Sequence, residues 1–287
     1  ASLGGSQIWL EPGETMTVEE LVKAAAVVSA NDACAALGEH ISGTIEGFVT
    51  AMNERAEQLG MEDTRFADCS GLDDSGYSCA LDVAKMAREL MTHSEIERFT
   101  TIWMDTLRGG KSQLVNTNKL LRHYTGITGL KTGTTQAAGH CLAATAVREN
   151  TGFIAVVLGC ATTKGRFNEA RAMLDYGFSN YVSFDPASAA PELIDLPVAG
   201  GQEQTVALTA DVPQTVLLKK GAEKQIAVAV ETEPSLTAPV EKGQIVGTWR
   251  LTAAGETVGE YPIRAACAVG EKTFRWAYGL LFSALIG

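Results

Sequence analysis

The chain has 287 residues, with 23 Lys and Arg against 34 Asp and Glu, which gives a formal net charge of −11 at pH 7 and a pI near 4.9. This acidic balance argues against a nucleic-acid-binding protein, because such proteins present clustered Lys and Arg to phosphate groups. No apolar run is long enough to span a membrane, and the length favours two domains with separate cores.

Helices are predicted for the first part of the chain. Thr17 and Glu20 have the spacing of a capping box, which predicts that a helix begins at Val18. Its apolar run ends at Val28. The chain therefore begins with a helical subdomain, whose further helices are expected at residues 31–39, 44–59 and 81–91.

An antiparallel sheet is predicted for the middle of the chain. Residues 103–115 indicate a short hairpin, and residues 127–135 indicate an edge strand. Two more strands, at residues 139–147 and 153–160, flank a turn at residues 149–152. A helix should then cover the sheet with an apolar face made of Phe167, Ala170, Leu174 and Phe178.

Short segments of alternating polarity, separated by turn residues, fill the region from Ala187 to Val269. They predict a small all-β domain. Asp185-Pro186 and Ala190-Pro191 interrupt regular structure, so the domain boundary is placed near Phe184.

Residues 274–286 are rich in aromatic and aliphatic side chains. A helix of this length would measure about 20 Å, too short for a hydrocarbon core of about 30 Å. A helix lying in the membrane interface, with Trp276 and Tyr278 at headgroup depth, is the favoured interpretation. The alternatives are that this segment packs on the protein itself or is a truncated fragment.

The six cysteines and four histidines lack the spacing of zinc ligands, so no metal or other cofactor is expected. If the hairpin turns between Asn150 and Thr151, Cys141 and Cys160 are directly opposed. Their Cβ atoms would then be about 4.5 to 5.5 Å apart, slightly above the usual disulfide separation. A disulfide and two packed thiols both remain open. The second candidate pair, Cys69 and Cys79, brackets a loop rich in Gly and Asp.

Two short motifs carry the candidate chemistry. The apolar run of the edge strand leads into Lys131-Thr132-Gly133, and the triplet Ser29-Ala30-Asn31 directly follows the first helix. None of the fourteen serines in the chain has a Lys three residues later, so the chain contains no Ser-x-x-Lys motif.

These motifs resemble those of the serine D-alanyl-D-alanine carboxypeptidases, the low-molecular-mass penicillin-binding proteins that trim bacterial cell-wall peptides. The resemblance implies an α+β fold, with a penicillin-binding-protein/β-lactamase-like transpeptidase domain followed by a small all-β domain. Its further segments, in chain order, are Gly4-Gly5-Ser6-Gln7-Ile8, Glu11-Pro12-Gly13-Glu14, Asp32, Asn116-Thr117-Asn118-Lys119-Leu120-Leu121, Thr134-Thr135 and Lys164-Gly165-Arg166. The expected division is a catalytic domain at 1–184, a β-rich domain at 185–270 and a candidate amphipathic membrane anchor at 271–287.

The resemblance implies catalytic roles for three residues. Ser29 would relay a proton between the Lys of a Ser-x-x-Lys motif and the leaving D-alanine. Asn31 would hydrogen-bond the peptide group of the substrate. Lys131 would place a positive charge near the terminal carboxylate and keep the neighbouring Lys and Ser in their reactive protonation state.

It also implies a substrate-binding strand. The hydroxyl of Thr132 would meet the carboxylate, Gly133 would leave room for the substrate backbone, and the backbone N–H of Thr134 would form half of an oxyanion hole. Lys131 belongs to the same binding set. The guanidinium of Arg166 would bind the carboxylate end of the substrate.

Structural alternatives exist for each site residue. Ser29 and Asn31 are residue types favoured at helix N-caps. Lys131 fits an edge-strand lysine that discourages aggregation, and Arg166 fits a solvated residue at the start of a helix.

The leading functional hypothesis is a penicillin-sensitive serine carboxypeptidase that removes the terminal D-alanine of peptidoglycan stem peptides through an acyl-enzyme. Its nucleophile is expected on an upstream segment, a possible N-terminal fragment of the same protein, so the chain alone should be inactive. The alternatives are a non-catalytic peptidoglycan-binding or scaffolding homologue and, less favoured, a β-lactamase. The expected location is the bacterial cell envelope, at the outer face of the cytoplasmic membrane, with β-lactams as inhibitors and the membrane surface as a partner of the C-terminal segment.

Overall fold

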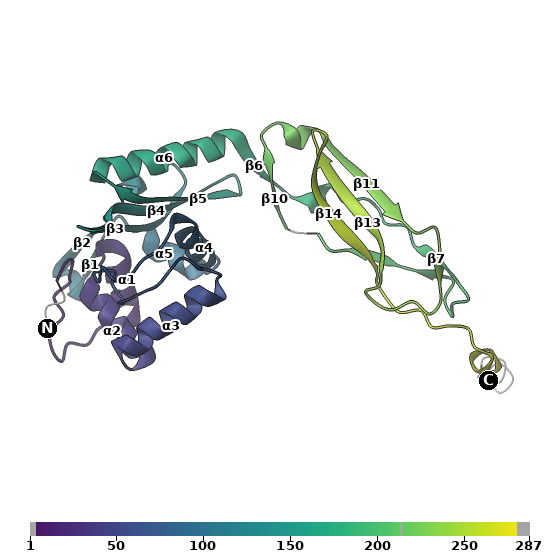
Figure 1. Ribbon diagram of the computed structural model, residues 1–287, viewed down its shortest axis with the longest axis horizontal. Coiled ribbons are helices and arrows are strands. Elements are labelled where there is room, and N and C mark those ends of the chain that lie inside the picture. Colours follow the sequence, from purple (N-terminus) through teal and green to yellow (C-terminus); the bar gives the residue numbers. More distant parts are fainter. Residues whose placement is uncertain (1–3, 213, 280–287) are drawn as a thin grey trace. The chain divides into compact units, whose positions relative to one another are not determined.

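The computed structural model describes residues 4–212 and 214–279, which form two compact units. The first unit ends at Ser179 and the second begins at Asn180. The first is a mixed helical and antiparallel structure and the second is built of strands, so the predicted fold class is confirmed (Figure 1).

The first helix, α1 (Val18–Val28), begins where the capping box predicts. The hydroxyl of Thr17 accepts from the backbone N–H of Glu20 at 3.2 Å, and the Glu20 carboxylate accepts from the N–H of Thr17 at 3.1 Å. The other helices of this subdomain are α2 (Asn31–Ser42), α3 (Ile45–Gln58), α4 (Ala80–Leu90) and α5 (Glu97–Thr100).

The second helix runs three residues beyond its predicted end at Glu39. Gly43, with φ 78°, terminates α2, and its N–H bonds to the carbonyl of Glu39. Since glycine adopts this left-handed conformation without steric cost, the helix continues to the nearest glycine that is free to end it.

A small apolar core holds α1 against the hairpin formed by β1 (Met104–Leu107) and β2 (Ser112–Val115). Ala24 and Val27 of α1 are completely buried there, beside Leu107 and Leu114 of the hairpin. This packing sets the position of the C-terminal end of α1, which carries Ser29.

The central sheet contains β3 (Ile127–Thr135), β4 (Gly139–Arg148) and β5 (Thr151–Cys160) in that order, all antiparallel, so β3 is an edge strand as predicted. One face packs against α6 (Thr163–Asn180), the helix that lies along the sheet in Figure 1. Its predicted apolar residues Phe167, Ala170, Leu174 and Phe178 are buried. On the other face, Leu130 and Ala143 pack against Ala87 of α4.

The prediction that Cys141 lies opposite Cys160 is wrong. Glu149 and Asn150 have φ values of 47° and 61°, which makes them the two central residues of a tight turn between Arg148 and Thr151. A bulge further along then places His140 opposite Cys160. The turn and the bulge each shift the register, and neither is visible in the polarity pattern. All six cysteines, Cys69 and Cys79 included, are free thiols.

Short strands build the second unit, in agreement with the expected all-β domain. The strands are β6 (Tyr181–Phe184), β7 (Leu196–Ala199), β8 (Thr205–Val206), β9 (Leu208–Ala210), β10 (Val216–Lys219), β11 (Ile226–Thr232), β12 (Leu236–Thr237), β13 (Ile245–Ala253) and β14 (Glu256–Ala265). The main sheet has the order β11-β13-β14-β9, and the core surrounds Trp249, Leu251 and Ile263, none of which is exposed.

The proposed anchor segment is only partly visible. Residues 274–279 are helical, with Phe274 87% exposed, whereas residues 280–287 lie outside the described part of the chain. No helix within residues 4–212 and 214–279 has the length and apolar character needed to cross a membrane.

Replacing the central tryptophan of the second unit should destabilise that unit. We expect Trp249→Ala to lower its free energy of unfolding by about 3 to 5 kcal/mol, because the substitution leaves a large cavity. Trp249→Phe should lower the unfolding free energy by a smaller amount. Phenylalanine fills part of the cavity, and the substitution removes an indole N–H that is buried without a hydrogen-bond partner among the described residues. Urea denaturation followed by circular dichroism measures both changes.

The control is Ile245→Thr in the same strand, at a side chain that is 58% exposed. It should change the unfolding free energy by no more than about 0.5 kcal/mol. Equal losses for Trp249→Ala and Ile245→Thr would contradict the assignment of Trp249 to the core.

Candidate active site

Ser29 lies in the turn between α1 and α2, in the left-handed conformation with φ 60° and ψ 41°. The alternative that Ser29 is the N-cap of α2 is wrong. Ala30 occupies the N-cap position of that helix and makes no side-chain capping bond. The Ser29 hydroxyl instead accepts a hydrogen bond from Lys131 Nζ at 2.7 Å. Residues 102 positions apart are thus joined in one site.

Asn31 is the first residue of α2 and is only 5% exposed. Its backbone N–H donates to Ser6 O at 2.8 Å, and its Nδ2 donates to Gly4 O at 3.0 Å. The next residue, Asp32, accepts from the N–H groups of Ile8 and Leu10. The start of α2 therefore holds residues 4–10 in place along the site.

Lys131 points into the site from the middle of β3, with Nζ donating to Ser29 Oγ and to Thr132 O, both at 2.7 Å. The alternative that Lys131 is an exposed edge-strand lysine is therefore wrong. The pKa of Lys131 is lowered to about 8, mainly by burial; the Cys34 thiol opposes this shift and the nearby Arg166 adds to it. The side chain is still mostly charged at neutral pH.

The rest of β3 presents hydroxyls and backbone to the same site. The buried Thr132 shares a 2.6 Å hydrogen bond with the hydroxyl of Thr117. A Cβ added at Gly133 would meet no protein atom nearer than Cys141 Cβ at 3.9 Å, so this glycine leaves open space over the strand. Thr134 donates its hydroxyl to Gly133 O at 2.7 Å.

Arg166 is buried at the start of α6 with 5% of its surface exposed, so the solvated alternative is wrong. Its Nη1 donates to Gly133 O and Thr134 Oγ1, both at 3.0 Å, and to Cys141 O at 3.2 Å. These bonds tie the end of β3 to the helix. They also place a permanent positive charge beside the strand.

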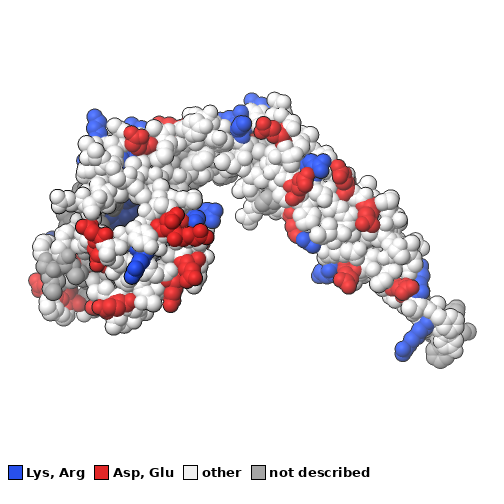
Figure 2. Space-filling view, in the orientation of Figure 1, with Lys and Arg blue, Asp and Glu red and all other residues white. Residues whose placement is uncertain are grey.

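These residues line a pocket of about 400 Å³, whose only formally charged described lining residues are Lys131 and Arg166. Figure 2 shows Lys or Arg atoms at the bottom of a hollow in the first unit. In a chain of net charge −11, a pocket with two cations and no carboxylate favours an anionic ligand. Its described lining is Gly5, Ser6, Ala25, Ser29, Asn31, Cys34, Ser70, Gly71, Leu72, Thr117, Lys131, Thr132, Gly133, Thr134, Thr135, Ala138, Cys141 and Arg166.

One wall of this pocket was missed by the sequence analysis. Ser70, Gly71 and Leu72 belong to a loop that Asp68 holds: its carboxylate accepts from Ser70 Oγ at 2.8 Å and from the N–H groups of Gly71 and Leu72. The run of Asp, Ser and Gly indicated a turn in the sequence. It carried no sign of which part of the sheet the turn would face.

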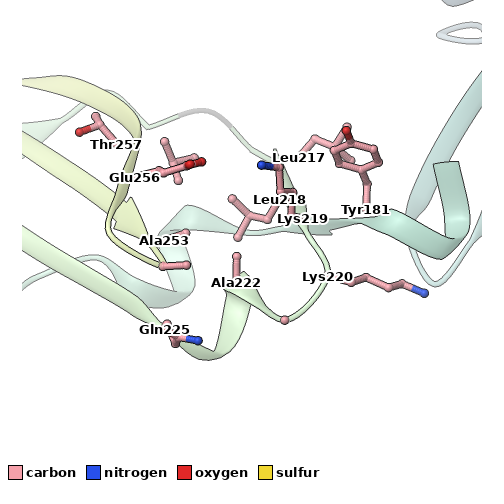
Figure 3. A pocket seen from close by; sticks show the side chains of 13 residues that line it. Tyr181, Leu217, Leu218, Lys219, Lys220, Ala222, Gln225, Ala253, Glu256 and Thr257 are labelled. Carbon is pink, nitrogen blue, oxygen red and sulfur yellow. The ribbon is translucent and has the colours of Figure 1, made fainter. Parts of the chain in front are cut away.

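A second hollow, of about 670 Å³, lies in the second unit (Figure 3). It combines Lys219 and Lys220 with Glu256 and Tyr181, and its described lining includes neither serine nor cysteine. Among residues 4–212 and 214–279, no three His, Cys, Asp or Glu side chains are grouped as metal ligands would be. The candidate chemistry is therefore concentrated in the pocket of the first unit.

Comparison with known proteins identifies the families that match each part of the chain. The D-alanyl-D-alanine carboxypeptidase family, peptidase family S11, matches residues 1–162, and the C-terminal domain of penicillin-binding protein 5 matches residues 184–271. The D-alanyl-D-alanine carboxypeptidase DacF of Bacillus subtilis strain 168 is 41% identical over 270 residues, which are 92% of this chain and 69% of that protein.

Solved structures show the same relationship. Penicillin-binding protein 5 of Haemophilus influenzae superposes with a TM-score of 0.81 at 32% identity, over 94% of this chain and 79% of that one. Penicillin-binding protein D2 of Listeria monocytogenes, in its ampicillin-bound form, superposes with a TM-score of 0.57 at 34% identity, over 62% of this chain and 74% of that one. With its two motifs meeting in one cationic pocket, the chain belongs to the D-alanyl-D-alanine carboxypeptidase family of penicillin-binding proteins.

Proposed function

We propose that the pocket of the first unit binds the D-Ala-D-Ala end of a peptidoglycan stem peptide, and that the terminal D-alanine is removed through a serine acyl-enzyme. The observation that carries this proposal is the 2.7 Å hydrogen bond between Lys131 and Ser29, in a pocket whose described lining residues include no carboxylate. It brings a cation for the substrate carboxylate next to a hydroxyl that can move a proton.

Recognition of the terminal carboxylate falls to β3. Lys131 supplies a half-buried positive charge, where an ion pair is stronger than in water. The hydroxyl of Thr132 points toward the same region through its bond with Thr117. Because Arg166 Nη1 already serves three acceptors, we assign Arg166 the positive potential around the carboxylate and the support of Thr134.

The chemical step needs a serine nucleophile. Its Oγ would attack the carbonyl carbon of the penultimate D-alanine, forming an ester as the C–N bond to the terminal D-alanine breaks. Ser29 would pass a proton to the departing amine, Asn31 would hold the peptide group, and the N–H of Thr134 would stabilise the oxyanion. Water would then hydrolyse the ester, and penicillins would be trapped at the ester stage.

We propose that this nucleophile belongs to a segment outside the 287 residues, since no serine of the chain is followed by Lys at the required spacing. The same absence favours one alternative, a non-catalytic peptidoglycan-binding homologue that keeps the pocket. A β-lactamase is less favoured, because no Asp or Glu is among the described lining residues to activate a deacylating water.

We also propose an extracytoplasmic location in the cell envelope, where peptidoglycan lies. The described part of the candidate anchor supports it, because Phe274 and Tyr278 are 87% and 61% exposed on one helical turn. Aromatic side chains of this kind favour the interface between lipid and water. The catalytic and β-rich domains would then stand on the outer face of the membrane.

Binding of a substrate peptide should weaken as pH rises through 8. Lys131 has its pKa lowered to about 8, so it is charged below that pH and neutral above it, and only the charged form attracts a carboxylate. Between pH 7 and pH 9.5 the affinity for an acetylated L-Lys-D-Ala-D-Ala tripeptide should fall by about tenfold or more, as measured by isothermal titration calorimetry.

The matched variants separate charge from shape. Lys131→Arg should bind with reduced affinity but without the pH dependence, because a guanidinium stays charged throughout this range. Lys131→Met should bind weakly at every pH. An unchanged affinity of the native chain between pH 7 and pH 9.5 would contradict the assignment of Lys131 to the carboxylate.

A fluorescent penicillin should leave the isolated chain unlabelled, because Ser29 and Lys131 have no Ser-x-x-Lys serine to activate. Intact-mass analysis and a denaturing gel measure this together. Addition of a segment that carries Ser-x-x-Lys should produce label on that segment. If the completed protein remains unlabelled, the non-catalytic alternative is correct, and label on the isolated chain would refute the need for a further segment.

A further inference from the structure

Trp9 is 69% exposed and adopts φ 60°. A large non-glycine side chain in this left-handed region is uncommon, and such strain persists only where the surrounding structure imposes it. Burial of the indole cannot be the reason for this conformation, because most of its surface faces solvent. The contacts around the residue show how the strain is maintained.

The carboxylate of Asp32 brackets Trp9. Its Oδ1 accepts from Ile8 N–H at 3.1 Å and its Oδ2 accepts from Leu10 N–H at 3.0 Å, one residue to each side. Ile8 is buried in the core beside α1, and Leu10 packs against the same core. With both neighbours held inward, the backbone turns the indole outward.

A second clamp holds the surroundings of the ring. Arg108 donates from Nε and Nη2 to the two oxygens of Glu14, at 2.6 and 2.9 Å, and from Nη1 to Ile8 O and Ser112 Oγ. Its Nη2 also lies 3.4 Å from Trp9 O. The Arg108 hydrogen bond lowers the pKa of Glu14 to about 2, so the pair is ionised and neutral overall at physiological pH.

These groups surround an open hollow of about 750 Å³, lined by Trp9, Glu11, Pro12, Glu14, Arg108 and Ser112 among others. An aromatic face beside fixed hydrogen-bond donors and acceptors, including the carboxylate of Glu11, suits a sugar ring, which has an apolar C–H face and a rim of hydroxyls. It suits a protein partner less, because the apolar surface is a single ring rather than a broad patch.

The hollow is connected to the proposed substrate pocket through one segment. Gly5 and Ser6 line that pocket, and Trp9 follows only three residues later, at most about 10 Å of extended chain from Ser6. A bound peptide of three to five residues would span about 10 to 18 Å. The end of the peptide that is linked to sugar can therefore reach the hollow.

We propose that Trp9, with Arg108, Glu14 and Ser112, forms a subsite for the N-acetylated amino sugar that carries the stem peptide. This inference rests on the proposed function, because that function supplies a peptide attached to a glycan strand. The ring of Trp9 stacks on the apolar face of the sugar. Arg108, Glu14 and Ser112 form hydrogen bonds with the hydroxyl and amide groups of the sugar. The subsite makes the enzyme prefer glycan-linked peptides over free ones.

The test uses a peptide-free N-acetylglucosamine tetramer titrated into the 287-residue chain and followed by ligand-observed nuclear magnetic resonance. Saturable binding is expected, with at least a tenfold loss in Trp9→Gly and a smaller loss in Trp9→Phe. Glycine relieves the strain at φ 60°, so Trp9→Gly should unfold at the same or a higher urea concentration than the native chain. A structural role for the indole predicts the opposite shift.

Binding of the D-Ala-D-Ala tripeptide should change less than twofold in Trp9→Gly, which separates the two proposals. If the native chain does not bind the tetramer, or if Trp9→Gly binds it as tightly as the native chain does, the sugar subsite is refuted and the peptide site is unaffected. Loss of tripeptide binding in Lys131→Met tests the proposed function independently. Trp9-dependent binding to phosphatidylglycerol vesicles without tetramer binding would reassign the ring to a membrane surface and overturn the proposal.

Discussion

The hydrogen bond from Lys131 Nζ to Ser29 Oγ joins the edge of the sheet to the turn between two helices, and the rest of the site depends on it. Each partner is positioned by a different core. Val27 and Ala24 hold the end of α1 against the β1-β2 hairpin, and Leu130 holds β3 against α4. A shift of either core would separate the two groups, because closely packed protein interiors transmit displacement.

The cost of this arrangement is the burial of positive charge. Two cations lie in a pocket whose described lining contains no carboxylate, and burial, with a smaller contribution from the charge of Arg166, lowers the pKa of Lys131. The protein offsets this with hydrogen bonds: Lys131 donates to Ser29 and Thr132, and Arg166 to Gly133, Thr134 and Cys141. An anionic ligand would complete the balance of charge.

The first two residues of α2 organise the segment that leads away from the pocket. Asn31 bonds to Gly4 and Ser6, and Asp32 bonds to the backbone on both sides of Trp9. One helix start thus supports the pocket wall and the exposed indole together. Under both proposals, the start of α2 positions the residues that bind the peptide end and the sugar end of one substrate.

The sequence by itself determined the order of the main elements and the position of the β3 edge strand. Thr17 and Glu20 predict the start of α1, and the apolar spacing from Phe167 to Phe178 predicts the buried face of α6, because local hydrogen bonding and periodicity decide such features. Resemblance of the ordered motifs selected Ser29, Asn31, Lys131 and Arg166. Tertiary structure alone decided that Ser29 ends one helix rather than capping the next, that a tight turn and a bulge separate Cys141 from Cys160, and that the loop held by Asp68 forms a pocket wall. These features arise from contacts between residues far apart in the chain and from positive φ values, neither of which leaves a periodic trace in the sequence.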